Sequence, residues 1–214
     1  MLQIETEGKE RSYMVAWCTK FQLEIMQRNR IIACMDSTHK VVRPLMPDGK
    51  KVKDASALFT ILVKDIVLHQ GIPIAYLICN TESTFLLKKW LSWLKGTCQF
   101  KVSKLMMDCS PIETEANYQH VDTNNLLESW FHTLKSHYLD GKTGYRADVV
   151  ISMLQGEIER DFKAQLLKVA HGVQAVKHSE YDNEREKEAM ALDVGTAKAM
   201  VTENVATYAV CNNR

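Results

Sequence analysis

Two runs of apolar residues, separated by a short polar connection, constrain the fold of this chain more than any other feature. Residues 57–67 read ALFTILVKDIV and residues 72–79 read IPIAYLIC, and Leu68-His-Gln-Gly71 joins them. Both runs are rich in β-branched and aromatic residues, which favour strands. Two such runs joined by a few residues that include glycine are typical of a β-hairpin. The sequence therefore predicts an antiparallel hairpin over residues 57–79.

Two further apolar runs each end in an aspartate. Residues 31–35 (IIACM) lead into Asp36, and residues 104–107 (KLMM) lead into Asp108. A buried strand that ends in an acid is a common way to hold a catalytic carboxylate still, and two such strand ends can meet at one edge of a sheet. The alternative is structural, because Asp36 can cap the turn after its strand and Asp108 can serve as a turn residue or a helix N-cap.

The remaining periodic segments read as helices. Apolar residues recur at helical spacing in four stretches, and a fifth stretch is less regular. The predicted helices cover residues 12–29, 81–95, 123–138, 146–177 and 189–200. Helices thus alternate with the predicted strands, and the sequence predicts an α/β fold with a mixed sheet and flanking helices.

The predicted helix 123–138 carries a polar face that includes a third acid. Asn124, Glu128, His132 and Lys135 recur at i, i+4, i+8 and i+11, so they share one side of the helix. Three carboxylates, two on strands and one on a helix, are the ligands that a two-metal phosphoryl-transfer site needs. An equally weighted alternative is a capping box in which Asn125 is the N-cap and Glu128 is the N3 residue.

Three basic side chains near these acids are candidates for orienting a phosphate or a carboxylate. They are His39, His132 and Lys135. An ordinary polar role on the surface or in the core is the alternative for each. No cysteine stands at zinc-site spacing from the histidines, so the sequence does not predict a zinc centre.

Composition narrows the class of protein. The 214 residues include 27 Lys and Arg against 26 Asp and Glu, so the net charge of +1 lacks the strongly basic character of most duplex-binding domains. The six cysteines form no CxxC pair, which favours reduced thiols. The first dozen residues lack an apolar signal region, and charged residues interrupt the longest apolar stretch. We therefore expect a soluble protein that is neither secreted nor membrane-bound.

Taken in order along the chain, four short motifs resemble the transposases of Mutator-like elements. The resemblance covers roughly residues 12–155. The motifs are Met35-Asp36-Ser-Thr-His-Lys40, a hairpin over residues 58–80 with Pro73-Ile-Ala-Tyr76, Met107-Asp108-Cys-Ser-Pro-Ile-Glu113, and Thr123-Asn-Asn-Leu-Leu-Glu-Ser-Trp130 followed by Leu134-Lys135.

This resemblance implies a ribonuclease-H-like fold with a DDE triad. Carried over by motif, the triad is Asp36, Asp108 and Glu128, and the family's histidine after the first aspartate matches His39. The implied cofactor is a pair of Mg²⁺ or Mn²⁺ ions held by the three acids. The implied partner is DNA at the transposon ends, which the near-neutral charge supports only weakly, and the implied location is the nucleus. The resemblance is also compatible with a homo-oligomer.

The chain departs from the family between the second and third acids. Only 128 − 108 = 20 residues separate Asp108 from Glu128, and a strand and a helical insertion are missing after Ala116. We therefore expect three regions, a helical lead-in over 1–29, a shortened ribonuclease-H-like core over 30–140 and a helical extension over 141–214. Three functions stay open: a transposase-derived enzyme, a domesticated module that binds DNA or protein without cutting, and an inactive remnant. For a remnant the expected location is the cytosol.

Overall fold

The computed structural model describes residues 2–5, 13–43, 56–80, 84–107, 123–174, 201–204 and 207–210. The chain divides into two compact units, Met1–Ala175 and Val176–Arg214. In the second unit, β7 (Val201–Asn204) pairs antiparallel with β8 (Thr207–Val210). These residues were expected to belong to a helical extension, and the structure shows strands there instead. The helix predicted over 189–200 lies outside the described residues.

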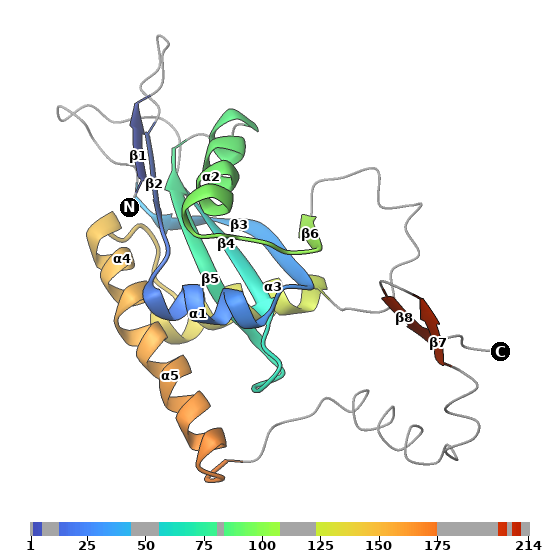
Figure 1. Cartoon of the computed structure of the whole chain (residues 1–214). Helices are drawn as coiled ribbons and strands as arrows, with labels where there is room; N and C mark the ends of the chain where they lie inside the picture. The colour runs from blue at the N-terminus through green and yellow to red at the C-terminus, as the bar shows by residue number, and fades with distance from the viewer. Residues whose placement is uncertain are drawn as a thin grey trace. The chain divides into compact units, whose positions relative to one another are not determined.

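A six-stranded mixed sheet forms the centre of the first unit, in the order β1-β2-β5-β4-β3-β6 (Figure 1). β6 runs parallel to β3, and the other neighbouring strands are antiparallel. The predicted α/β class with a mixed sheet is confirmed. The strands are β1 (Leu2–Glu5), β2 (Tyr13–Trp17), β3 (Ile32–Val42), β4 (Ser56–Lys64), β5 (Gly71–Cys79) and β6 (Lys104–Met107).

The predicted hairpin is present as β4 and β5, and both strands are buried almost throughout. Its first strand is shorter than expected, because β4 ends at Lys64 and not at Val67. The fully buried Asp65 turns the chain: its Oδ1 atom accepts hydrogen bonds from the backbone N–H groups of Val67 and Leu68, each at 3.0 Å. A carboxylate that satisfies the next backbone donors ends a strand, although its neighbours are apolar.

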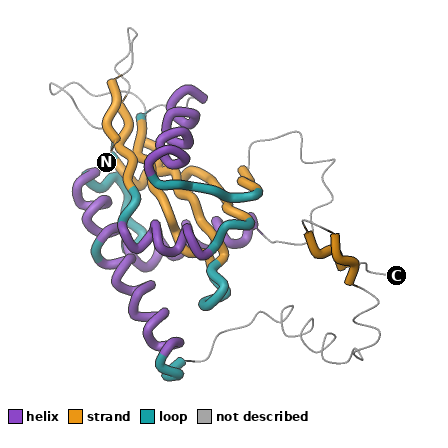
Figure 2. Tube along the Cα trace, viewed as in Figure 1, coloured by secondary structure: helices purple, strands orange, loops and turns teal. Residues whose placement is uncertain are grey.

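Helices cover both faces of the sheet (Figure 2). On one face lies α2 (Thr84–Thr97), whose Trp90 ring is 6.5 Å from the ring of Phe59 on β4. The opposite face carries α3 (Thr123–Thr133), which continues as the π-helical turn η3 (Leu134–Tyr138). The ring of Trp130 on α3 lies 6.2 Å from the ring of Phe162, so α3 packs against the later helix that carries Phe162. The two layers bury the sheet on both sides, as the apolar strands require.

The predicted helix 146–177 is two helices, α4 (Ala147–Gln155) and α5 (Glu157–Ala170), which meet at Gly156. A Cβ at Gly156 would lie only 2.8 Å from the carbonyl oxygen of Ser152. The close backbone approach therefore requires glycine at the junction. Within the described part of the chain, no helix is long and apolar enough to span a membrane.

The helix predicted over residues 12–29 is wrong in its first half. Residues 13–17 form β2, which pairs with β5, and α1 (Lys20–Arg28) begins only after Thr19. Thr19 and Gln22 form a capping box that starts the helix there. The Gln22 side-chain amide also donates to the carbonyl of Pro73 at 3.2 Å, so α1 covers the part of the β5 edge that β2 leaves unpaired.

Candidate functional site

Asp36 lies within the central strand β3, opposite Thr60 of β4. The prediction that the strand ends at Asp36 is wrong, because pairing with β4 continues to Thr38 and resumes at Val42 after an irregularity. Tertiary pairing thus overrides the polar composition of residues 36–40. The side chain is half-buried, and its Oδ1 atom accepts a hydrogen bond from the backbone N–H of Ser37 at 2.6 Å. The strand therefore holds the carboxylate in place.

The register of β3 and β4 fixes the face on which the Asp36 side chain lies. Asp36 pairs with Thr60 and Cys34 pairs with Leu62, so these side chains share one face. Leu126 of α3 contacts that face, since its Cβ lies 3.7 Å from the position that a Cβ on Gly71 would take, where Leu62 also lies. The Asp36 carboxylate and α3 are therefore on the same side of the sheet.

The second predicted acid, Asp108, lies outside the described residues. The strand before it, β6, runs parallel to β3 and pairs Met107 with Met35. Each of the two predicted aspartates is the next residue in sequence after one member of this pair. The strands β3 and β6 therefore lie side by side at Met35 and Met107, the residues directly before the two aspartates.

Glu128 is exposed on α3, while its neighbours Leu127 and Trp130 are buried. The capping-box alternative for this residue is wrong, because α3 already begins at Thr123 and Asn125 lies within its first turn. His132 is exposed on the same helix, as the predicted polar face requires. Glu128 is thus a carboxylate open to solvent on the helix that packs over the Asp36 face.

The other two candidate orienting residues lie at irregular points of the backbone. Lys135 is exposed within η3, where the backbone N–H of Leu139 donates to the carbonyl of Leu134, five residues earlier. The wider π-helical turn changes the spacing on which the predicted shared face of residues 124–135 depends. His39 is exposed on β3, three positions from Asp36. It lies within the irregular stretch of β3 between Thr38 and Val42, next to Lys40, whose φ is +66°.

A row of buried polar groups extends from Asp36 across the sheet. Asp36 pairs with Thr60, Thr60 with Tyr76 and Tyr76 with Trp17. The Thr60 hydroxyl, the Tyr76 hydroxyl and the Trp17 indole N–H are all buried, and none has a hydrogen-bond partner among the described residues. Burial, together with Glu159 and Tyr138, raises the pKa of Tyr76.

Sequence reasoning did not identify this row. The available signal was a threonine and a tyrosine inside otherwise apolar strands. Only the register shows that Thr60 lies next to Asp36 and that Tyr76 lies next to Thr60.

Whether this site fits a divalent cation depends on the donor atoms that it offers. Mg²⁺ prefers oxygen ligands, and Asp36 places a half-buried carboxylate beside the unpartnered Thr60 hydroxyl. Among the described residues, no three His, Cys, Asp or Glu side chains converge as a metal site requires. The oxygen chemistry fits Mg²⁺ or Mn²⁺, and a complete ligand set needs an acid from outside the described part.

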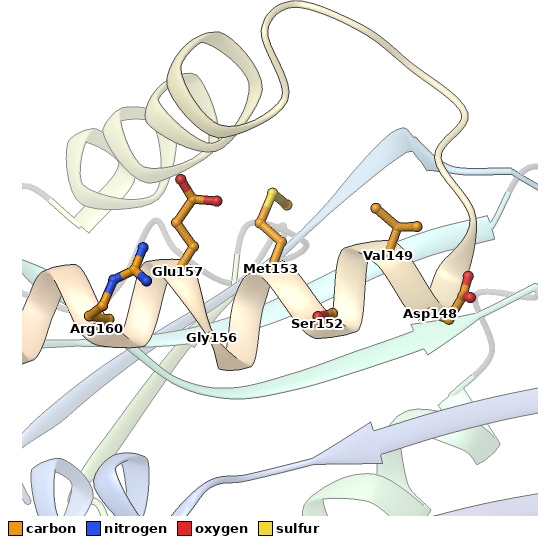
Figure 3. A pocket seen from close by; sticks show the side chains of 7 residues that line it. All are labelled: Asp148, Val149, Ser152, Met153, Gly156, Glu157 and Arg160. Atoms are coloured by element: carbon orange, nitrogen blue, oxygen red, sulfur yellow. The ribbon is translucent and has the colours of Figure 1, made fainter.

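An open hollow on the described surface lies elsewhere. It has a volume of about 690 Å³ and is lined by residues of α4, Gly156 and α5 (Figure 3). Asp148, Glu157 and Arg160 contribute charges of both signs to its wall. None of the predicted site residues lines it, so this hollow and the Asp36 site are separate features.

Comparison of the chain with protein-family models, with curated proteins and with solved structures finds no match.

Proposed function

We propose that the first unit is a ribonuclease-H-like domain derived from a Mutator-like transposase. The four sequence motifs support this proposal, and so does the strand order. The central strand β3 has the antiparallel hairpin β4–β5 on one side and the parallel strand β6 on the other, and α2 connects the hairpin to β6. This is the arrangement that a ribonuclease-H-like core has around its first catalytic strand.

The pairing of Met35 with Met107 is the single observation that carries the proposal furthest. It aligns the segments that lead into Asp36 and Asp108, and α3 brings Glu128 to the Asp36 side of the sheet. These three acids would hold Mg²⁺ or Mn²⁺, and the ions supply activation of a water nucleophile and stabilisation of the leaving oxygen of a phosphodiester. The Ser37 N–H, bonded to Asp36, orients that carboxylate.

DNA is the substrate class of this proposed activity, and a nuclear location follows from it. A second function, that of a module which binds DNA or protein without cutting, is favoured by a different observation. Glu128 is exposed, and the described residues do not gather three metal ligands. The short connection of 128 − 108 = 20 residues between the second and third acids also favours it.

Nicking of supercoiled plasmid DNA by the purified full chain tests the two functions. We expect nicking that requires Mg²⁺ or Mn²⁺ and falls to background in Asp36→Asn, Asp108→Asn and Glu128→Gln. Asp140→Asn is the matched control, because its exposed carboxylate pairs with Lys142 and it is none of the three proposed metal ligands. We expect this control to nick like the parent chain.

Absence of nicking by a folded parent chain would refute the enzyme. DNA retained in a gel-shift assay under those conditions would then support the binding module. A parent chain that neither nicks nor binds DNA would refute both the enzyme and a DNA-binding module.

A further inference from the structure

The helices α4 and α5 present one exposed face to solvent. Residues of both helices line the open hollow, so they share this face (Figure 3). Leu167 follows Arg160 by seven residues, about two helical turns, and therefore lies on the same face of α5. The opposite sides of the two helices are buried in the core through Val150, Leu154, Ile158 and Phe162. We call the outer face the set of residues Val149, Met153, Gly156, Glu157, Arg160 and Leu167.

The outer face has apolar ends and a charged centre. Val149 is 45% exposed at one end and Leu167 is 59% exposed at the other. In the centre, exposed Glu157 and Arg160 carry opposite charges, and Gly156 beside them has no side chain. A single exposed aliphatic residue needs no explanation, but two on one helical face, with charges between them, form a surface suited to contact.

The outer face is complementary to a second copy of itself that runs in the opposite direction. Val149 and Leu167 are equally far from residue 158, since 158 − 149 = 9 and 167 − 158 = 9. Gly156 and Arg160 are also equally far from it, since 158 − 156 = 2 and 160 − 158 = 2. In a two-fold dimer, residue i contacts residue j of the other copy and j contacts i. An axis at the level of residue 158 therefore places apolar ends against apolar ends, and each Arg160 over Gly156 of the second copy.

We infer that the outer face is a homodimer interface, in which two copies pack α4 and α5 antiparallel about a two-fold axis at the level of residue 158. Charge complementarity selects a second copy as the occupant, because Arg160 of each copy then lies beside Glu157 of the other and the ion pair forms twice. The missing side chain at Gly156 leaves room for the guanidinium group. This interface is independent of the proposed nuclease site.

The length of the outer face sets the strength that we expect of the dimer. From Val149 to Leu167 the chain advances 167 − 149 = 18 residues, which is about 27 Å of helix. A contact along one helical face of this length is small beside the interfaces of obligate dimers. We therefore expect a dissociation constant in the micromolar range.

Sedimentation equilibrium of the purified full chain, at concentrations from about 1 to 200 μM, tests the inference. We expect the parent chain to dimerise within this range. Val149→Glu and Leu167→Glu should each weaken the dimer by at least about tenfold, because a charge replaces an apolar contact. Phe85→Glu is the matched control, because Phe85 is also 59% exposed but lies on α2. We expect this control to dimerise like the parent chain.

Charge exchange tests the direction of packing. Arg160→Glu and Glu157→Arg each place like charges against one another in the dimer, so each variant alone should dimerise at least about tenfold more weakly. An equimolar mixture of the two variants should regain dimers, because both ion pairs form again between unlike copies. Recovery on mixing requires contact between two copies, and a change confined to the fold of one chain would not produce it.

Three results would overturn the inference: a parent chain that stays monomeric throughout the concentration range, a dimer that Val149→Glu and Leu167→Glu leave unchanged, or no recovery of dimers when the two charge variants are mixed. All variants are first compared with the parent chain in urea unfolding. Asp36→Asn is expected to dimerise normally, so failure of the proposed nuclease and failure of this inference are distinguishable.

Discussion

Replacement of Asp65 by alanine is the sharpest test of how the hairpin is built. The Asp65 carboxylate is fully buried and accepts three hydrogen bonds, from the backbone of Val67 and Leu68 and from the Asn29 side chain. The Asn29 side chain in turn donates to the carbonyl of Ile25 at 2.9 Å. A single side chain therefore links the hairpin turn to the end of α1.

The size of the expected loss of stability follows from the three hydrogen bonds that the Asp65 carboxylate accepts. A hydrogen bond to a charged acceptor contributes about 1.5–3 kcal/mol, and a buried donor left without a partner costs about 1–3 kcal/mol. Val67 is half-buried and not fully buried, which reduces the cost of an unpaired donor there. We expect Asp65→Ala to lower the free energy of unfolding by about 3–5 kcal/mol, a large share of a typical domain's stability.

Urea unfolding followed by circular dichroism measures this loss. Asp65→Asn keeps one oxygen acceptor, so we expect a smaller loss of about 1–3 kcal/mol. Asp140→Asn is the matched control, because Asp140 is exposed in an ion pair with Lys142, and we expect an unchanged unfolding midpoint. A loss below about 1 kcal/mol in Asp65→Ala would refute the role assigned to this carboxylate.

Three further predictions follow from single contacts. Gly156→Ala should lower stability by about 1–3 kcal/mol in urea unfolding, because its Cβ would lie 2.8 Å from the Ser152 carbonyl oxygen, and equal stability would contradict the required close approach. Tyr76→Phe should leave stability unchanged or raise it by up to about 1 kcal/mol, since the buried hydroxyl has no partner among the described residues. A loss instead would show that the hydroxyl has a hydrogen-bond partner other than the described residues. Burial raises the pKa of Cys34 from 9.0 to about 11, so alkylation by iodoacetamide, followed by mass spectrometry, should be slow near neutral pH and accelerate toward the raised pKa. Because the unfolded thiol loses its proton first, the stability contribution of this group is present below pH 9.0 and is lost as pH rises toward about 11, and rapid alkylation at neutral pH would contradict the burial.

The elements that sequence reasoning predicted well are those with a strong local pattern. The β4–β5 hairpin follows from two long apolar runs and a short turn. Helix α2 follows from its apolar spacing, with Leu86, Trp90 and Leu94 buried as the pattern requires. Local pattern was sufficient in these places because burial and propensity favour the same structure.

The elements that were predicted wrongly are those whose structure is decided by strand pairing or by a single contact. Residues 13–17 resemble the start of a helix, but an open edge of β5 pairs them as β2. Asp36 resembles a strand end, but β4 extends the pairing beyond it. Gly156 breaks a helix whose apolar periodicity continues on both sides. No local signal outweighs such long-range contacts.

By itself, the sequence determined the α/β class, the hairpin, the helices α2 and α3, and the acids that make a metal-dependent site conceivable. Only the tertiary structure decided that Asp36 faces α3, that β6 aligns with β3, that an unpartnered polar row adjoins Asp36, and that Asp65 closes the hairpin turn. The physical reason is that side-chain periodicity is local, whereas the face and the neighbours of a residue depend on strand register, which is set by contacts between segments far apart in the chain.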